Sequence, residues 1–210
     1  MRTLIIETAT AACSVALTED GAVLAQTHEV VGRGHAERLI PMIAALPGQG
    51  RADNILVDCG PGSFTGVRVG LAAARGLAIG WSCEVAGYSS LPLIAAAGFA
   101  SDPTLAELAV VLEGGHGEVF MQIFAAQPFV ESGPFRSFAP AAAIHTLGAR
   151  PAFGNGIRHL AALDPHLDLR EALPRAADAL LLPQAFTTLP PRPIYGRAPD
   201  AKTLAERGLA

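Results

Sequence analysis

The sequence lacks several residue patterns that common binding sites require. It contains a single lysine, Lys202, so a phosphate-binding loop of the Gly-Lys-Ser/Thr type is excluded. Only 16% of its 210 residues are charged, and the formal net charge is −4. Proteins that bind nucleic acid directly usually carry a clustered basic surface, so we expect any contact of this chain with tRNA to be indirect.

Cysteine is also scarce, and a long apolar run is missing. The three cysteines lie in apolar stretches without the short spacing of paired ligands: Cys13, Cys59 and Cys83. We therefore expect no disulfide bonds and a reducing compartment. The longest uncharged stretch, residues 85–101, falls short of the ~20 apolar residues of a membrane span, and Glu7 interrupts the only leader-like run. The sequence thus predicts a cytoplasmic protein without membrane contact.

Hydrophobic residues, by contrast, make up half of the chain. This share is high for a soluble protein, and it favours an apolar surface that is reserved for a partner. An alanine-rich composition gives the same percentage, so the number alone leaves both explanations open.

The first hundred residues predict three strands followed by alternating helices and strands. Asp20-Gly21 is a strong hairpin signal between the second and third strands. In the first helix, Pro41 predicts a late start or a kink. The buried stripe of that helix is predicted to be Leu39, Ile40, Ile43 and Leu46. The predicted elements are strands 3–8, 13–18 and 22–29, helix 36–46, strand 54–59, helix 66–80, strand 83–86 and a helix that opens at residues 89–90.

This order is typical of the actin-like, ribonuclease-H-like fold, in which three meandering strands precede βα units. A shorter version begins at residue 109, with strand 109–113, a hairpin partner at 118–126, a strand near 129–138 and a helix from Pro140. The sequence therefore predicts an α/β protein with two tandem βββαβα-type domains, residues 1–100 and residues 101–210. The second domain is predicted to be degenerate and shortened, with a proline-rich tail that packs back on the first.

The most informative segment is the glycine-rich stretch at residues 60–70, GPGSFTGVRVG, between strand 54–59 and helix 66–80. A strand-to-helix turn of this kind presents backbone N–H groups and a positive helix end to a phosphate or a carboxylate. Its spacing, G-x-G-x-x-x-G, is one residue off the dinucleotide fingerprint. Two interpretations stay open. One is a tight turn for close helix–sheet packing, and the other is a nucleotide-like loop formed by Glu7, Thr8, Thr10, Gly60, Gly62 and Ser63.

Several segments together resemble the TsaB family, which takes part in making N6-threonylcarbamoyladenosine in tRNAs that read codons beginning with adenine. The resemblance covers roughly residues 1–98, and the glycine-rich stretch is nearly diagnostic. Weaker similarity extends to EVF at 118–120 and to the tail. The segments that carry the resemblance are LIIETAT at 4–10, CSVAL at 13–17, HAERLIP at 35–41, GPGSFTGVRVG at 60–70 and PIYGRAPDAK at 193–202.

The resemblance implies a non-catalytic scaffold that pairs with TsaD, the related metal-bearing transferase. In agreement, the six histidines contain no H-x-x-x-H pair of the kind that such a metal site needs. The implied partners are a TsaD-like protein in a heterodimer, a TsaE-like ATPase in a larger complex and a second copy when the chain is alone. No cofactor of its own is implied, and ATP or ADP at the complex boundary stays open. The alternatives are a small-molecule kinase or ATPase that uses Glu7, Thr8 and Thr10, and a metallopeptidase, which the missing histidine pair disfavours.

The family's docking mode implies that helices 36–46 and 66–80 pair with two helices of the partner. Small residues in the second helix would let a partner helix approach closely, although the same alanines could instead pack on the sheet. The interface residues implied are His35, Arg38, Leu39, Met42, Ile43, Arg68, Leu71, Ala72, Arg75 and Gly76.

Two positions depart from the family pattern. Glu7 stands where the family usually has Asp, at the place where kinases of this fold put a magnesium-handling carboxylate. Residues 113–115, Glu-Gly-Gly, replace the family's common Asp-Ala-Arg. The first departure disfavours tight phosphate chemistry at Glu7, and the second removes any role of the family's arginine.

Overall fold

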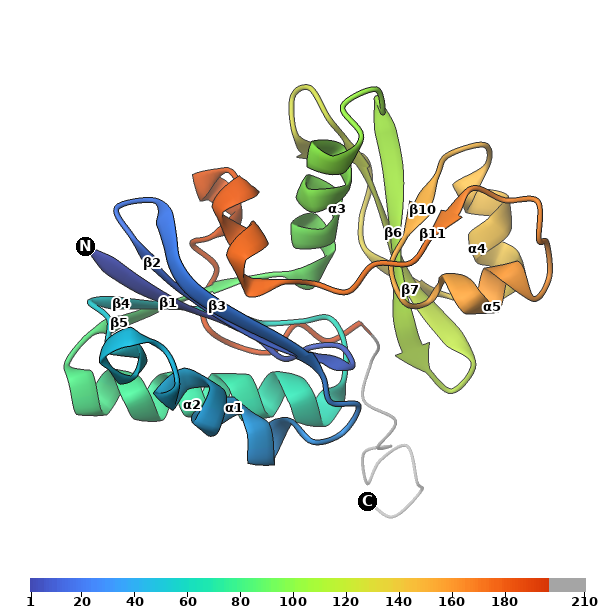
Figure 1. The fold of residues 1–210 in the computed structure, drawn as a ribbon. Coiled ribbons are helices and arrows are strands. Elements are labelled where there is room, and N and C mark those ends of the chain that lie inside the picture. Colours follow the sequence, from blue (N-terminus) through green and yellow to red (C-terminus); the bar gives the residue numbers. More distant parts are fainter. Residues whose placement is uncertain (197–210) are drawn as a thin grey trace, which may run out of the picture.

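The computed structural model describes residues 1–196, which form two sheets with helices packed on them (Figure 1). The first sheet has the strand order β3-β2-β1-β4-β5, in which β1 is antiparallel to β2 and parallel to β4. The predicted βββαβαβα order of this half is confirmed. Its elements are β1 (Arg2–Glu7), β2 (Ala12–Glu19), β3 (Ala22–Val30), α1 (His35–Ala44), β4 (Asn54–Asp58), α2 (Phe64–Trp81), β5 (Glu84–Tyr88) and α3 (Ser90–Ser101).

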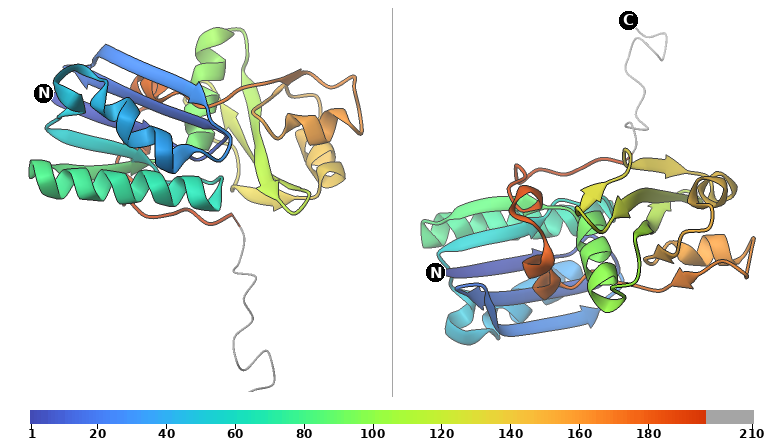
Figure 2. Two further views of the ribbon diagram at one scale, coloured as in Figure 1. Left: turned by 60° about the horizontal axis from the view of Figure 1, so that its bottom comes forward. Right: turned by 90° about the horizontal axis from the view of Figure 1, so that it is seen from above.

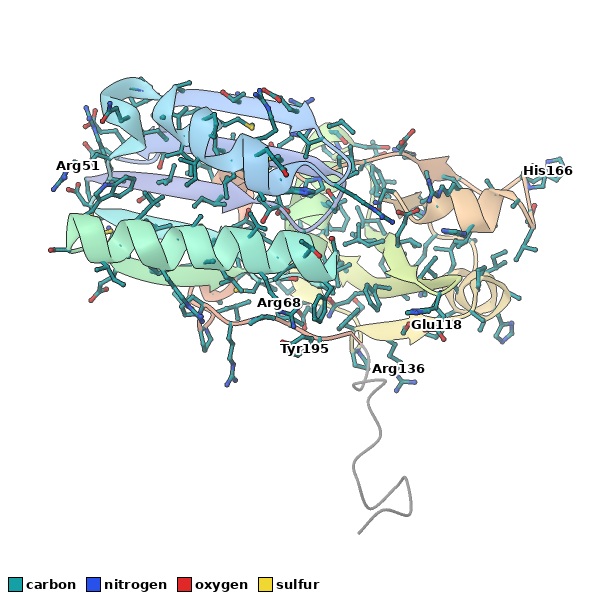
Figure 3. All side chains as sticks on the ribbon, turned by 90° about the horizontal axis from the view of Figure 1, so that it is seen from below. Arg51, Arg68, Glu118, Arg136, His166 and Tyr195 are labelled. Atoms are coloured by element: carbon teal, nitrogen blue, oxygen red, sulfur yellow. The ribbon has the colours of Figure 1, made fainter. Side chains whose placement is uncertain are left out.

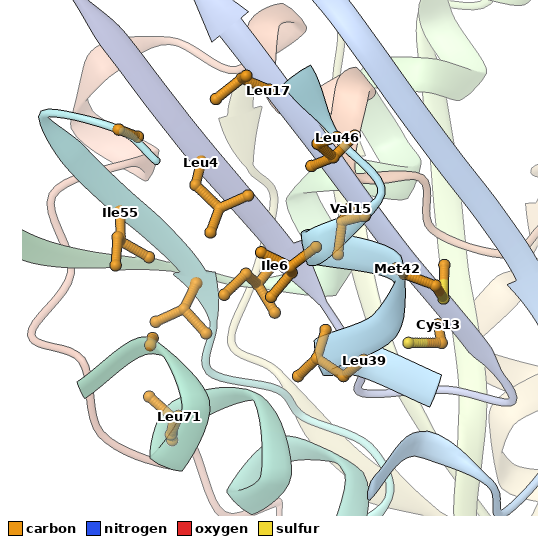
Figure 4. Packing of buried hydrophobic residues seen from close by; sticks show 14 of the residues in the cluster. Leu4, Ile6, Cys13, Val15, Leu17, Leu39, Met42, Leu46, Ile55 and Leu71 are labelled. Carbon is orange, nitrogen blue, oxygen red and sulfur yellow. The ribbon is translucent and has the colours of Figure 1, made fainter. Parts of the chain in front are cut away.

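Both faces of the first sheet are covered, because alternate side chains of its strands point to opposite sides. Leu4 and Ile6 pack under α1 and α2, in the core that Figure 4 shows in close-up. Ile5, between them, packs with Tyr88 and Leu93 on the other side. A strand that is buried on both faces has a nearly continuous apolar sequence, as β1 has.

Helix α1 corrects one sequence prediction. The helix begins at His35 and continues through Pro41, so the proline does not delay its start. Met42 is buried against the sheet, whereas Ile40 is 49% exposed. The 3.6-residue period alone permits either residue beside Leu39 and Ile43, and only the position of the helix on the sheet selects between them.

The second sheet is smaller, with the strand order β11-β10-β6-β7-β8 and with β9 paired to β7. Only β6 and β7 are long. The single strand predicted near 129–138 is wrong, because the chain forms two short strands on either side of Gly133 and Pro134, and proline cannot donate to a ladder. The elements of this half are β6 (Glu107–Gly115), β7 (Glu118–Ala125), β8 (Val130–Glu131), β9 (Arg136–Phe138), α4 (Pro140–Leu147), β10 (Ala152–Phe153), α5 (Ile157–Ala161) and β11 (Leu169–Arg170).

The chain after β11 returns to the first sheet, as the two views of Figure 2 show. Two 3-10 segments, η2 (Ala176–Leu181) and η3 (Gln184–Phe186), lie over the face opposite α1 and α2 (Figure 1). Leu189 then bridges Gly87 of β5 in antiparallel fashion, and the Ile194 N–H donates to the Cys59 carbonyl at 2.7 Å. Residues 197–202 of the tail motif lie outside the described residues. Among residues 1–196, no helix combines the length and the apolar character needed to cross a membrane.

Candidate functional site

Two carboxyl groups are buried side by side at the carboxyl edge of the first sheet. Parallel pairing of β1 with β4 brings Glu7 next to Asp58, and both are 0% exposed. The Ala9 N–H donates to Glu7 Oε1 at 2.8 Å, and the Tyr88 hydroxyl lies 3.1 Å from Glu7 Oε2. The Gly60 N–H donates to Asp58 Oδ2 at 3.0 Å. Each carboxyl is therefore tied to a backbone turn next to the end of its own strand.

Burial dominates the acidity of this pair. It raises the pKa of Asp58 to about 7, and burial together with the charge of Asp58 raises the pKa of Glu7 well above its ordinary value. The backbone hydrogen bonds from the Ala9 N–H to Glu7 and from the Gly60 N–H to Asp58 lower the two pKa values, but their effect is smaller. Two ionised carboxylates would repel each other in this low-dielectric site, so the pair retains a proton near neutral pH.

The glycines of residues 60–70 bring the loop and α2 directly onto the turn that follows β1. A Cβ at Gly62 would overlap the Ala9 carbonyl oxygen, and a Cβ at Gly66 would overlap that of Thr8. The Ser63 N–H donates to Ala9 O at 2.6 Å, and Thr8 Oγ1 donates to Gly66 O at 2.9 Å. Close packing of helix on sheet is therefore what these glycines permit.

The six residues of the nucleotide-like loop predicted from the sequence do converge at this edge, but their polar groups bond to one another and to the backbone. The oxygens of Glu7 and the hydroxyl of Thr8 are used as described above. Thr10 Oγ1 accepts from the Ala12 N–H at 3.2 Å, and Ser63 Oγ caps α2 by accepting from the Gly66 N–H at 3.2 Å. The loop packs on the turn after β1 through Gly62 and Gly66, whereas Ser63, Phe64 and Thr65 at the start of α2 are exposed. Phosphate binding by this loop stays a prediction.

The outer side of the α1–α2 layer has a different character, because apolar side chains reach solvent there. Phe64 is 68% exposed and Ile79 is 83% exposed, and Ile40 of α1 adds a third apolar side chain. Ala72 and Gly76 of α2 are exposed between them. We call these five residues the helix face: Ile40, Phe64, Ala72, Gly76 and Ile79.

Half of the interface residues expected from the sequence belong to the core instead of this face. Each is at most 3% exposed, since the side of each helix that carries them packs on the sheet. His35 is held there by a 3.1 Å contact from Nε2 to the Ala12 carbonyl oxygen. The buried residues are His35, Leu39, Met42, Ile43 and Leu71.

The three arginines expected at the interface bind groups of their own chain. Arg38 forms a two-pronged ion pair with Glu29, with its shorter N–O distance at 2.6 Å. Arg75 donates to the Pro191 carbonyl at 2.7 Å. Arg68 donates to the Tyr195 hydroxyl at 2.9 Å and covers the Phe64 ring, and Figure 3 shows Arg68 and Tyr195 beside α2. These contacts fix the arginines around the rim of the helix face.

Sequence reasoning missed Ile40, Phe64 and Ile79. A signal was present, because in α2 the buried positions Gly70 and Ala74 place Ile79 on the opposite side of a 3.6-residue helix. Several large apolar residues that are exposed on one face of a helix indicate an interaction surface, whereas single exposed apolar residues are common on any protein.

Within residues 1–196, no cluster of three or more His, Cys, Asp or Glu side chains has the arrangement of a metal site. Glu113, at the second departure from the family pattern, pairs with Arg158 and lies 3.6 Å from His159 Nε2. Glu113, the first residue of the Glu-Gly-Gly segment, is thus joined to α5 by an ion pair.

Comparisons with known proteins agree with this architecture. A family model described as TsaD, tRNA N6-adenosine threonylcarbamoyltransferase, matches residues 24–127. The Escherichia coli tRNA threonylcarbamoyladenosine biosynthesis protein TsaB is 41% identical over 125 residues, which are 57% of this chain and 53% of that protein. YeaZ from Pseudomonas aeruginosa superposes with a TM-score of 0.73 at 28% identity, covering 86% of this chain and 89% of that one. This chain belongs to the TsaB/YeaZ-type family.

Membership in this family confirms the actin-like α/β fold predicted from the strand order. A Mycobacterium bovis protein is 30% identical over 220 residues, covering 96% of this chain and 94% of that protein. The matches to the two TsaB proteins from Escherichia coli and Haemophilus influenzae are shorter, because they span 53% and 42% of those proteins. The segment that the TsaD family model matches, residues 24–127, includes the glycine-rich loop and both helices of the helix face.

Proposed function

We propose that this chain is a non-catalytic partner of a TsaD-type threonylcarbamoyltransferase in N6-threonylcarbamoyladenosine modification of tRNAs that decode ANN codons. The observation that carries the proposal is the helix face, an exposed apolar surface on the two helices that precede and follow β4. The relatives named TsaB are biosynthesis proteins of the same modification. In this proposal the partner covers the helix face, and a second copy covers it when the chain is alone.

The chemistry of the glycine-rich loop supports a scaffold over an enzyme. Both oxygens of Glu7 are hydrogen-bonded within the chain, to the Ala9 N–H and to the Tyr88 hydroxyl, and the side chain is fully buried, so the Glu7 carboxylate is not available to a metal–phosphate complex. We therefore propose that the loop is a structural joint which fixes α2, and that the chain needs no cofactor of its own. A TsaE-like ATPase, and contact with tRNA, belong to the larger complex in this proposal.

The size and geometry of the helix face suit helix–helix docking. Ala72 and Gly76 carry little or no side chain, so a partner helix can approach the α2 backbone closely. Ile79 and Phe64 flank them and offer the apolar anchors that dominate such interfaces. Arg68 and Arg75 lie on the same helix and supply a polar rim.

Co-expression with the TsaD-like protein of the same genome tests the proposal. With a tag only on this chain, size exclusion of the purified material is expected to show both proteins in a 1:1 peak. Recovery of this chain only as a homodimer or monomer, with the TsaD-like protein absent from the peak, would contradict it.

An Ala72→Arg substitution is expected to weaken the heterodimer at least about tenfold, because it places a long charged side chain where a helix must approach. The measurement is the dissociation constant by calorimetry. Ala161→Arg is the matched control, since Ala161 is an exposed helical alanine of α5, away from the helix face. Equal weakening by both variants, or by neither, would remove the helix face as the docking surface.

The purified chain alone is expected to release no phosphate from ATP or GTP with magnesium above the background of a Glu7→Gln variant. The reason is the closed packing of Thr8, Ala9 and Gly62 at the end of α2. Magnesium-dependent release that Glu7→Gln abolishes would instead establish the small-molecule kinase or ATPase alternative.

A further inference from the structure

A cavity of about 500 Å³ lies on the side of the first sheet opposite the helix face. It is bounded by β3, α3 and the chain that leads from β11 into η2, drawn in orange to red in Figure 1. Its volume is in the range of small-molecule sites. One part of its wall is apolar: Ile94, Ala97, Phe153, Leu173 and Pro174.

The rest of the wall carries both signs of charge. His28 comes from β3, Glu171 and Arg175 from the connection, and Asp178 from η2. Within residues 1–196, the side chains of Glu171, Arg175 and Asp178 make no hydrogen bond or ion pair, whereas the neighbouring Arg170 binds both Asp102 and Asp168. Charged side chains that line a cavity without forming hydrogen bonds or ion pairs are available to a ligand.

The imidazole of His28 adds an independent observation. Its Nδ1 atom is buried and has no hydrogen-bond partner among the described residues. A buried polar atom without a partner is uncommon in a folded protein, because leaving it unpaired costs free energy. A ligand with a polar group in the cavity would remove this cost.

Arg175 interacts electrostatically with two other polar residues of the wall, His28 and Asp178. Burial lowers the pKa of His28 and raises that of Asp178, and the Arg175 cation lowers the pKa of both. Arg175 therefore lies near both groups. His28 and Asp178 are half-buried, whereas Arg175 and Glu171 are exposed. An ion pair with the half-buried Asp178 is stronger than the same pair on an open surface.

We propose that this cavity binds a small zwitterion that carries one amino group and one carboxylate on an apolar body, the chemistry of a free aliphatic or aromatic amino acid. The carboxylate would pair with Arg175, and the ammonium group would pair with Asp178 and Glu171. A phosphate would meet two carboxylates, and a simple amine would leave Arg175 unpaired. The apolar wall receives the side chain of the ligand.

Calorimetry on the full chain tests this with L-leucine and L-phenylalanine as probes. N-acetyl-leucine lacks the ammonium group, leucine amide lacks the carboxylate, and inorganic phosphate serves as the competing anion. We expect at least one of the two amino acids to bind, and its counterpart derivatives to bind at least about tenfold more weakly. Absence of binding by both amino acids at millimolar concentration would overturn the proposal, as would tighter binding of phosphate.

Variants assign the two charged contacts. Arg175→Gln is expected to weaken amino-acid binding about tenfold or more and to change the binding of leucine amide little, because the amide has no carboxylate. Asp178→Asn is expected to weaken amino-acid binding to a similar extent and to change the binding of N-acetyl-leucine little, because that derivative has no ammonium group. Arg33→Gln, at an exposed arginine outside the cavity, is the control for the loss of one positive charge. Unchanged affinity in both cavity variants would overturn the assignment. If one variant fails to fold, the other variant and the two leucine derivatives still test the proposed amino-acid site.

This inference does not depend on the proposed partnership with TsaD. The helix face and the cavity lie on opposite sides of the first sheet, so Ala72→Arg is expected to leave amino-acid binding unchanged.

Discussion

Replacing Gly66 by alanine is expected to lower the free energy of unfolding by about 3 kcal/mol, in the upper range of overpacking effects. The added methyl group would overlap the backbone carbonyl oxygen of Thr8, which cannot turn away as a flexible side chain can. The shift would also disturb the hydrogen bond from Thr8 Oγ1 to Gly66 O. Urea denaturation of the purified chain measures the change.

Gly76→Ala is the matched control, since Gly76 lies in the same helix and a methyl group added there would meet open space. At this position alanine has only the advantage of its helix propensity, so the isolated chain is expected to gain about 1 kcal/mol. If Gly66→Ala were as well tolerated as Gly76→Ala, the loop would not be the joint that fixes α2.

The second large effect concerns the buried pair Glu7 and Asp58. A free aspartate loses its proton near its ordinary pKa of 3.8, whereas Asp58 in the folded chain keeps it up to about pH 7. Between these values the folded state binds more protons than the unfolded state. The free energy of unfolding is therefore expected to fall as the pH rises through this range, and the raised pKa of Glu7 adds to the fall.

Asp58→Asn removes the cost of ionising this buried group while keeping an oxygen that accepts from the Gly60 N–H. The variant is expected to be more stable than the parent by about 2 kcal/mol at about pH 8, and to differ by less than about 1 kcal/mol at about pH 5. Urea midpoints across the pH range measure this difference. Glu131→Gln, a change of the same charge at an exposed position, is the control.

A parent protein whose stability is flat or rises between about pH 5 and pH 8 would contradict the assignment, as would an Asp58→Asn variant that parallels the parent throughout. A variant that is destabilised equally at both pH values would show that hydrogen bonding, and not ionisation, dominates the pair.

Local sequence determined the order of the elements and the family. The hairpin at Asp20-Gly21, the turn at residues 60–70 and the alternation of strands and helices follow from backbone preferences and side-chain periodicity, which involve residues close together in the chain. The glycine-rich loop could be recognised for the same reason, because its pattern lies within eleven consecutive residues, 60–70. This locality also limited what the loop could reveal, because a tight turn and a phosphate loop need the same glycines.

Tertiary structure decided what those elements present. The docking of α1 on the sheet exposed Ile40 and buried Met42, which the helical period left undetermined. Parallel pairing of β1 with β4 placed Glu7 beside Asp58, and the return of the chain after β11 brought Arg175 to His28. Burial and the proximity of distant residues depend on how whole elements pack. Local preferences among neighbouring residues do not specify that packing, so the sequence by itself predicted the elements and only the fold assembled the helix face, the acidic pair and the cavity.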